Sequence, residues 1–422
     1  MLAKVYLTLN RKADAMLLLS DIIVNGGYRL QSDYSSVFSI TNEMNSEILF
    51  SIRYKSGTVG LGSPFANLFA PNNSGNAVVN GDGDGKNYPT EELKDAYGSI
   101  SRVQKARGNT GQLSPSSYNL SFSNAPANGN TLVAIITCRS NTASTVTGLS
   151  QTGANWVRAT QAVNTNGTTT EIWYASNVNN ATNRLTVSIN PCKSAAIMME
   201  YKGVDVNNPV EEMSQSFGNA NSFDAGALDT RKFYGAMVGA VGLDNSTYTV
   251  SNIAAPFSYV YIDSSRTSTV DQNAKLYAYE SFPDFPGMYH FSGQISAVSN
   301  WAGVSIALKS GDSRKDFNIR RYVSKDYVNK YMSNLVVAND GENDWPVIRY
   351  ADVLLMMAEA QGYTNASVDL INQVHKRAGL PEIAYASITT NAAFEKALSD
   401  ERRFEFAFEN HRWFDMVRYN TT

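Results

Sequence analysis

The sequence predicts a multidomain α + β protein in which an all-β sandwich interrupts an α-helical domain. Apolar residues recur at helical spacing near both ends of the chain, whereas the middle consists of short alternating runs between turns rich in Asn, Ser, Thr and Gly. The 422 residues allow roughly three units at about 150 residues per domain. We expect a first helical segment at 1–98, a β-sandwich at 99–311 and a second helical segment at 312–422.

The first segment opens with a predicted helical hairpin. Apolar residues keep helical spacing from Leu2 to Ile23, with a break at Asn10 and a stop at Gly26. Three more helices are expected in the last segment. The apolar face of the first carries Tyr350, Val353, Leu354 and Met357, and that of the second carries Val368, Ile371 and Val374 before the helix ends at Gly379. The third runs from about Ala392 to Arg418.

Between these segments the sequence predicts strands. Regular turns and the lack of a helical pattern favour an all-β sandwich, inserted where the two ends of a surface loop lie close together. A weak two-fold pattern relates the runs of the first half to those of the second. The strands are expected at 130–136, 172–174, 184–189, 195–201, 234–241, 275–280 and 303–308.

The composition excludes several classes of protein. With 35 Lys and Arg residues against 38 Asp and Glu residues, the net charge of −3 provides no general field for nucleic acids or anionic membranes. No run approaches the roughly 18 apolar residues that a membrane-spanning helix needs. The first residues do not form a signal peptide, so the chain is either cytoplasmic or an internal piece whose export signal lies upstream.

Reactive side chains are sparse. Cys138 and Cys192 are too few for a disulfide framework or a thiolate metal cage, although one bridge between them stays open if they lie on neighbouring strands. The three histidines, His290, His375 and His411, lack metal-ligand spacing, and no nucleophile elbow or phosphate-binding loop is found. The chain is therefore predicted not to be an enzyme; a hydrolase would need two carboxylates flanking the scissile bond.

One loop has the spacing of a calcium site. Asn80, Asp82 and Asp84 stand at the first, third and fifth positions, a glycine at the sixth and Glu91 at the twelfth. Calcium needs six to eight oxygen ligands around such a tight turn. However, Asn replaces the usual first Asp, Pro89 occupies the tenth position, and no helix enters the loop. The alternative is a solvated Gly/Asp turn.

Aromatic side chains supply candidates for sugar binding, because ring faces pack against the C–H surfaces of sugars. Tyr54, Phe65, Phe69 and Tyr88 lie in a stretch rich in Gly, Ser and Asn, and Trp156 follows a turn in the sandwich. Packing under a loop is the alternative for each. The other tryptophans, Trp173, Trp301, Trp345 and Trp413, are expected in the core or in structural positions.

A charged run marks the last predicted helix. Glu401, Arg402, Arg403 and Glu405 are expected to form a charged helix face, with local ion pairs worth about 0.2–0.5 kcal/mol each. The alternative is that the cluster serves the fold or a partner contact.

Four segments of the helical ends carry a family pattern. They are 2–7 (LAKVYL), 347–360 (VIRYADVLLMMAEA), 371–381 (INQVHKRAGLP) and 401–415 (ERRFEFAFENHRWFD). In order and spacing they resemble the SusD/RagB family, the outer-membrane lipoproteins of Bacteroidetes glycan-utilisation systems. The resemblance covers about 1–98 and 312–422 and implies a tetratricopeptide-like helical scaffold. It also implies that the chain is a fragment cut at both ends, without the lipid anchor.

The middle of the chain resembles a different group, a lectin-like β-sandwich module of bacterial secreted proteins. The resemblance rests on 125–134 (APANGNTLVA), 171–175 (EIWYA), 200–204 (EYKGV) and 301–309 (WAGVSIALK). No firm activity follows from it. The flanking segments 90–97 and 312–316 resemble parts that lie near each other in the helical family, which favours an insertion.

The family resemblance implies a function. The expected protein is a non-catalytic, surface-exposed outer-membrane protein that binds oligosaccharide or starch-like polysaccharide and delivers it to a TonB-dependent SusC-like transporter for nutrient uptake. Its expected partners are the glycan and the transporter, with no nucleic acid, and with membrane contact only through a lipid anchor. No cofactor is required, and calcium is the one candidate. In the alternative, the β-sandwich is a protein-interaction or spacer module without sugar affinity.

Overall fold

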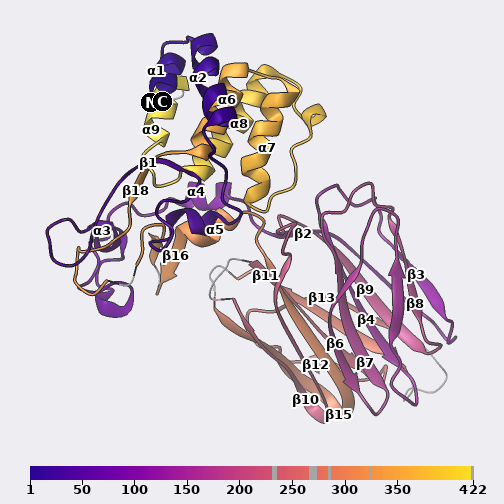
Figure 1. Ribbon diagram of the computed structural model, residues 1–422. Coiled ribbons are helices and arrows are strands. Elements are labelled where there is room, and N and C mark those ends of the chain that lie inside the picture. The colour runs from indigo at the N-terminus through magenta and orange to yellow at the C-terminus, as the bar shows by residue number, and fades with distance from the viewer. Residues whose placement is uncertain (231–234, 266–272, 284–286, 324, 334, 420–422) are drawn as a thin grey trace. The chain divides into compact units, whose positions relative to one another are not determined.

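The computed structural model describes residues 1–230, 235–265, 273–283, 287–323, 325–333 and 335–419 (Figure 1). The chain folds into two compact units. Unit 1 comprises Met1–Tyr97 and Asp312–Thr422, and unit 2 comprises Gly98–Gly311. Helices dominate unit 1 and strands dominate unit 2, so the fold is a mixture of both. Residue 234, the first of the strand predicted at 234–241, lies outside the described residues.

Unit 1 has one helical core to which both of its chain segments contribute. The predicted hairpin is confirmed, since Asn10 adopts a φ of 57° and separates the first two helices. Leu7 and Leu19 from this hairpin pack in the same buried cluster as Leu354 and Ile371. The helices of the unit are α1 (Leu2–Thr8), α2 (Lys12–Asn25), α3 (Phe65–Phe69), α4 (Glu91–Ala96), α5 (Ser313–Asn318), α6 (Tyr350–Gln361), α7 (Asn365–Arg377), α8 (Asn391–Glu405) and α9 (Arg412–Tyr419), with 3-10 turns at Tyr34–Phe38, Gly75–Ala77 and Tyr385–Ser387.

The last predicted helix is wrong in one respect, because the structure divides it. Helix α8 ends at Glu405 and α9 begins at Arg412. Phe408 and Asn410 between them adopt φ values of 66° and 62°, in the left-handed region that ends a right-handed helix. The turn brings the Glu409 carboxylate to the buried cations Lys330 and Arg349. Helical periodicity in the sequence does not predict such a contact.

Short strands complete unit 1. β1 (Ile48–Ile52) pairs antiparallel with β18 (Trp345–Arg349), which lies almost 300 residues later in the chain. β16 (Ile319–Tyr322) and β17 (Lys325–Val328) form a second antiparallel pair. The β1–β18 pair joins the two chain segments outside the helical core.

The prediction of local ion pairs at 401–405 is wrong, and the alternative of a role in the fold is confirmed. Glu401, Arg402 and Glu405 are 2%, 1% and 0% exposed. Arg402 pairs with Asp352 at 2.8 Å and with Asp415 at 2.9 Å. The face is charged because it packs against other charges inside the unit, not because it faces water.

The described residues of unit 2 form three antiparallel sheets. Their strands are β2 (Ser101–Asn109), β3 (Ser117–Ser121), β4 (Thr131–Arg139), β5 (Val146–Ser150), β6 (Val157–Asn164), β7 (Thr168–Ala175), β8 (Arg184–Ile189), β9 (Lys193–Lys202), β10 (Val210–Asp229), β11 (Gly235–Leu243), β12 (Val250–Ser251), β13 (Ser258–Ser264), β14 (Lys275–Ser281) and β15 (Met288–Lys309). The strand order is β2-β9-β4-β7-β6 in the first sheet, β10-β15-β11-β14-β13 in the second, where β12 also pairs with β15, and β3-β8-β5 in the third.

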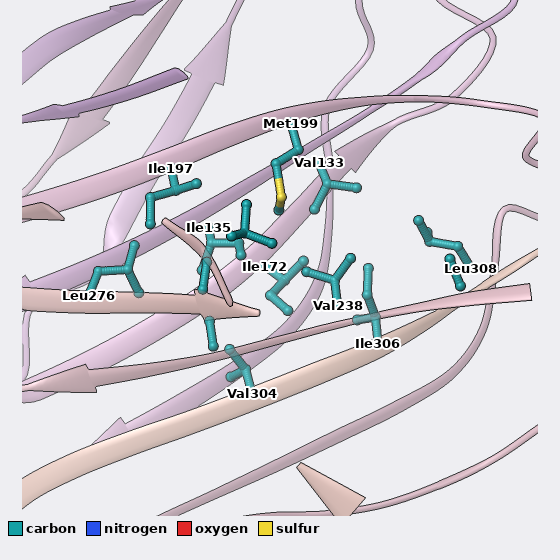
Figure 2. Packing of buried hydrophobic residues seen from close by; sticks show 14 of the residues in the cluster. Val133, Ile135, Ile172, Ile197, Met199, Val238, Leu276, Val304, Ile306 and Leu308 are labelled. Atoms are coloured by element: carbon teal, nitrogen blue, oxygen red, sulfur yellow. The ribbon is translucent and has the colours of Figure 1, made fainter. Parts of the chain in front are cut away.

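The first sheet is buried on both faces. Val133 and Ile135 of β4 pack with residues of the second sheet such as Val304, as Figure 2 shows. The alternate residues Leu132 and Ile136 pack with the third sheet. Side chains of a strand alternate between faces, so burial of both faces explains the nearly continuous apolar run of β4. The third layer was not expected from the sequence.

The weak two-fold pattern has a structural counterpart. In the first sheet β9 and β7 flank β4, and in the second β15 and β14 flank β11 in the same way. The runs that resemble each other in sequence therefore occupy matching places in two facing sheets.

The core between the first two sheets gives a stability prediction. Ile197 on β9 is fully buried there. We expect Ile197→Val to lower the free energy of unfolding of unit 2 by about 0.5–1.5 kcal/mol, because it removes one buried methylene group. Calorimetry of the full chain measures this loss. The same change at Ile52, which is 49% exposed, serves as the control and should cost less than about 0.5 kcal/mol; equal losses would contradict the prediction.

Candidate functional site

A cleft of about 460 Å³ opens in unit 1 between the loop that follows β1 and the segment that precedes β18. The antiparallel pairing places Ile52, the end of β1, opposite Trp345, the start of β18. The two loops therefore meet although they are far apart in the sequence. The volume lies within the range of about 300–1,000 Å³ that is usual for ligand pockets.

The first wall is the loop Ser56–Gly57–Thr58. Gly57 and Thr58 adopt φ values of 109° and 59°, which turn both backbone N–H groups toward one acceptor. Both donate to Oδ2 of Asp340 at 2.8 Å. The Ser56 hydroxyl donates to Oε1 of Glu342 at 2.8 Å. Two carboxylates of the opposite segment thus fix the shape of this wall.

The second wall combines apolar side chains with a fixed backbone. Leu335, Val336 and Val337 line the cleft together with Ile40. Val336 is 89% exposed. Its carbonyl accepts a hydrogen bond of 2.6 Å from the Asn80 side chain, which holds the segment in place. The wall presents aliphatic surface opposite hydroxyls and carboxylates, a combination suited to a ligand with both C–H faces and hydroxyl groups.

Ser333 adds a polar residue to the wall of the cleft. The residue lines the cavity, and its hydroxyl is buried without a hydrogen-bond partner within the described parts of the chain. A buried hydroxyl without a partner is costly.

A small charged group adjoins the cleft near Ile40. Arg53 pairs with both Glu43 and Asp344 at 2.5 Å. Burial and the neighbouring Asp344 raise the pKa of Glu43, whereas Arg53 opposes the rise. Asp344 also accepts a hydrogen bond of 2.9 Å from the Tyr54 backbone. These bonds attach the end of β1 to the segment before β18.

Three of the aromatic candidates pack against one another in a cluster. Phe65 lies 5.8 Å from Tyr54, 5.7 Å from Phe69 and 4.5 Å from Trp345 between ring centroids. Tyr331 stacks on Trp345 at 4.8 Å. Since Tyr54, Tyr331 and Trp345 adjoin the two cleft segments, the cluster supports the walls and does not line the cavity.

The remaining aromatic candidates lie elsewhere. Tyr88 is 41% exposed and donates to the Asn72 side chain at 3.1 Å, but it does not line the cleft. Trp156, in unit 2, is half-buried against the cluster of the first and third sheets, and its indole N–H is buried. Trp413, predicted to be structural, is 63% exposed, because α9 turns Asp415 inward to reach Arg402.

Three of the four predicted calcium residues, Asn80, Asp82 and Glu91, bond to other parts of the chain. Asp82 accepts hydrogen bonds from the backbone N–H groups of Gly83 and Gly75, which lower its pKa. Glu91 pairs with Lys94 one helical turn away, and Asp84 is exposed. The described residues contain no group of three or more His, Cys, Asp and Glu side chains that could hold a metal ion. Calcium binding at Asn80–Glu91 stays a prediction.

The two cysteines are both buried, free thiols. Cys138 lies on β4, and Cys192 precedes β9. The bridge that the sequence left open is absent from the structure, although both thiols belong to the same buried cluster.

The cleft residues escaped sequence reasoning. All but Ser333 lie in two polar, glycine-containing turns, 55–60 and 339–344, which read as ordinary loops. The first turn combines Gly with Ser and Thr, and the second combines Gly with acidic residues, so the two share no pattern beyond the glycines. The residues concerned are Ser56, Thr58, Ser333, Asp340 and Glu342.

The chain belongs to the SusD family, whose model matches residues 176–422. The match begins within unit 2 and continues through the second segment of unit 1. This membership agrees with the prediction of a binding protein and not an enzyme. No helix in the described part of the chain is long and apolar enough to cross a membrane.

Known proteins similar to this chain are also SusD-like. The SusD-like protein P38 of Formosa agariphila is 29% identical over 102 residues, covering 22% of this chain and 20% of that protein. A SusD superfamily protein of Parabacteroides distasonis is 15% identical with a TM-score of 0.42, covering 99% of this chain and 50% of its own. Surface glycan-binding protein A of Bacteroides thetaiotaomicron, solved with laminarihexaose, is 15% identical with a TM-score of 0.39, covering 99% and 53%. The chain thus spans about half the length of these solved structures.

Proposed function

We propose that unit 1 binds an oligosaccharide in the cleft between the loop after β1 and the segment before β18. The observation that carries the proposal is the cavity of about 460 Å³, whose lining includes Ser333 with its unpartnered hydroxyl. The aliphatic wall of Leu335 and Val337 suits the C–H face of a sugar ring, and the carboxylate of Glu342 suits its hydroxyl groups. Membership of the SusD family supports a carbohydrate as the ligand.

We further propose that the protein acts at the outer-membrane surface, where it delivers the glycan to a TonB-dependent SusC-like transporter. The open cleft agrees with this role, because a ligand that must be passed on has to dissociate readily. The support for the transporter and for the outer-membrane location comes from the family alone.

A single substitution tests the cleft. Ser333→Ala should weaken oligosaccharide binding by the full chain by about 3–10-fold, since it removes one hydrogen bond to a ligand hydroxyl. The free energy of unfolding should not fall, because the hydroxyl has no partner among the described residues. Isothermal titration with a panel of neutral oligosaccharides, including laminarihexaose, measures the affinity.

The control is Ser20→Ala on the exposed side of α2. It makes the same chemical change away from the cleft and should leave binding as it is. Equal affinities of the two variants, or no binding of any oligosaccharide by the unmodified chain, would count against the proposed function.

A second candidate role concerns unit 2 alone, as a spacer or protein-interaction module without sugar affinity. The observation that favours it is the packing of Trp156, which leaves this aromatic candidate half-buried with its indole N–H inaccessible.

A further inference from the structure

The cleft of unit 1 carries negative charge. Asp340 and Glu342 line the cavity of about 460 Å³, and no Lys or Arg is among the described residues that line it. Arg53, the arginine beside the cleft, is already paired with the carboxylates of Glu43 and Asp344. The lining that the structure describes is therefore acidic and leaves Asp340 and Glu342 without a cation.

The two carboxylates lie close together, because both bond to the same short loop. Oδ2 of Asp340 accepts hydrogen bonds of 2.8 Å from the backbone N–H groups of Gly57 and Thr58. Oε1 of Glu342 accepts a hydrogen bond of 2.8 Å from the Ser56 hydroxyl. Donors on three consecutive residues thus hold both acids. Two negative charges at short range repel each other, so a cation that enters the cleft is attracted by both.

Glu342 is the acid that a ligand can reach. Its side chain is exposed, and within the described ranges no hydrogen bond or ion pair engages Oε2. The second oxygen of Asp340 is less accessible, because a Cβ atom at Gly62 would collide with Oδ1. Glu342 therefore offers a free carboxylate oxygen, and Asp340 adds charge behind it.

The rest of the cleft narrows the class of cation. The second wall presents the aliphatic surface of Leu335, Val336 and Val337, which suits C–H groups. A metal ion needs more ligands than two acids provide, and the described part of the chain has no group of three or more His, Cys, Asp and Glu side chains that could hold one. A sugar ring with an amino group combines C–H faces, hydroxyl groups and one compact positive charge.

We propose that this cleft prefers an amino sugar, whose ammonium group pairs with Oε2 of Glu342 while the charge of Asp340 adds to the attraction. The inference rests on the proposed function, the binding of an oligosaccharide in this cleft, and specifies the class of sugar. Glu342 is then the residue that determines specificity.

The test compares one sugar in two charge states on the full chain. At about pH 6 the amino groups of a chitosan trisaccharide are protonated. In low-salt isothermal titrations it should bind about 3–10-fold more tightly than its fully N-acetylated form, because acetylation removes the charge that pairs with Glu342. Glu342→Gln should remove most of this difference. Glutamine keeps an oxygen that accepts the Ser56 hydrogen bond, so the wall of the cleft is retained.

Two controls separate this preference from general charge attraction. Glu395→Gln makes the same change at an exposed residue of α8 and should keep the full difference between the two trisaccharides. Trilysine, a cation without sugar rings, should bind more weakly than the chitosan trisaccharide.

Three results would overturn the preference and leave oligosaccharide binding by the cleft standing. They are equal affinities of the unmodified chain for the two trisaccharides, an unchanged difference in Glu342→Gln when calorimetry shows that it is folded, and binding of trilysine as tight as that of the chitosan trisaccharide. If the unmodified chain bound neither trisaccharide nor any neutral oligosaccharide, the proposed function would fall as well.

Discussion

Glu405→Gln is expected to lower the free energy of unfolding of unit 1 by about 3–5 kcal/mol, the usual loss when one partner of a buried ion pair is removed. Glu405 is 0% exposed and contacts three arginines. Its carboxylate lies 2.7 Å from Arg349, 3.2 Å from Arg314 and 2.5 Å from Arg377. Glutamine fills the same space but leaves three buried guanidinium groups short of one negative charge.

The network around Glu405 explains why the loss should be large. Arg349 also binds Glu47 at 2.5 Å and Glu409 at 2.8 Å, so it joins the first and second segments of unit 1. Burial alone would raise the pKa of Glu405, but Arg377, Arg349 and Arg314 outweigh burial and hold that pKa well below its usual range. The carboxylate therefore stays ionised in the folded protein at neutral pH.

Calorimetry of the full chain measures the loss, and a matched variant on the same helix provides the control. Asp400 pairs with Lys396 on the exposed side of α8. Asp400→Asn should cost less than about 0.5 kcal/mol, because exposed pairs contribute little. If both variants lost the same amount, or Glu405→Gln lost under about 1 kcal/mol, the network would not stabilise unit 1 as described.

Acid should unfold unit 1 before unit 2. Five buried carboxyl groups of unit 1 have pKa values lowered by neighbouring cations, in each case against the opposing effect of burial. They are Asp352, Glu401, Glu405, Glu409 and Asp415.

The loss of stability of unit 1 in acid follows from proton uptake on unfolding. In the unfolded chain these groups titrate near their ordinary values of about 3.9 for Asp and 4.3 for Glu, so below about pH 4 the unfolded state binds more protons than the folded state. Their contribution is complete above about pH 5 and is lost as the pH falls toward the lowered pKa values. Five such groups would lower the free energy of unfolding by roughly 5 kcal/mol between pH 5 and pH 3.

Unit 2 should respond differently. Burial raises the pKa of Asp205, so protonation of this group favours the folded state as the pH falls. In calorimetric scans from pH 7 to pH 3, the melting temperature of unit 1 should fall, and that of unit 2 should change less. Ile197→Val identifies the transition of unit 2, and Glu405→Gln that of unit 1. Parallel movement of both transitions would contradict this assignment.

Much of the local structure could be predicted because it depends on near neighbours in the chain. The hairpin of α1 and α2 and the strand at Arg184–Ile189 follow from periodicity and turn residues alone. The aromatic candidates show the limit of such reasoning. Phe65 and Phe69 have the composition of a sugar platform, but only their contacts with Tyr331 and Trp345 reveal that they pack inside the unit.

The sequence by itself determined the succession of helical, β-rich and helical segments, and its motifs pointed to the family to which the chain belongs. The tertiary structure alone decided which polar groups face water. Glu405 and Arg402 look like surface residues until Arg349 and Asp352 surround them, and Ser333 becomes a candidate ligand contact only because β1 pairs with β18. The physical reason is the same in each case: burial and charge pairing depend on residues far apart in the chain, which local patterns do not relate.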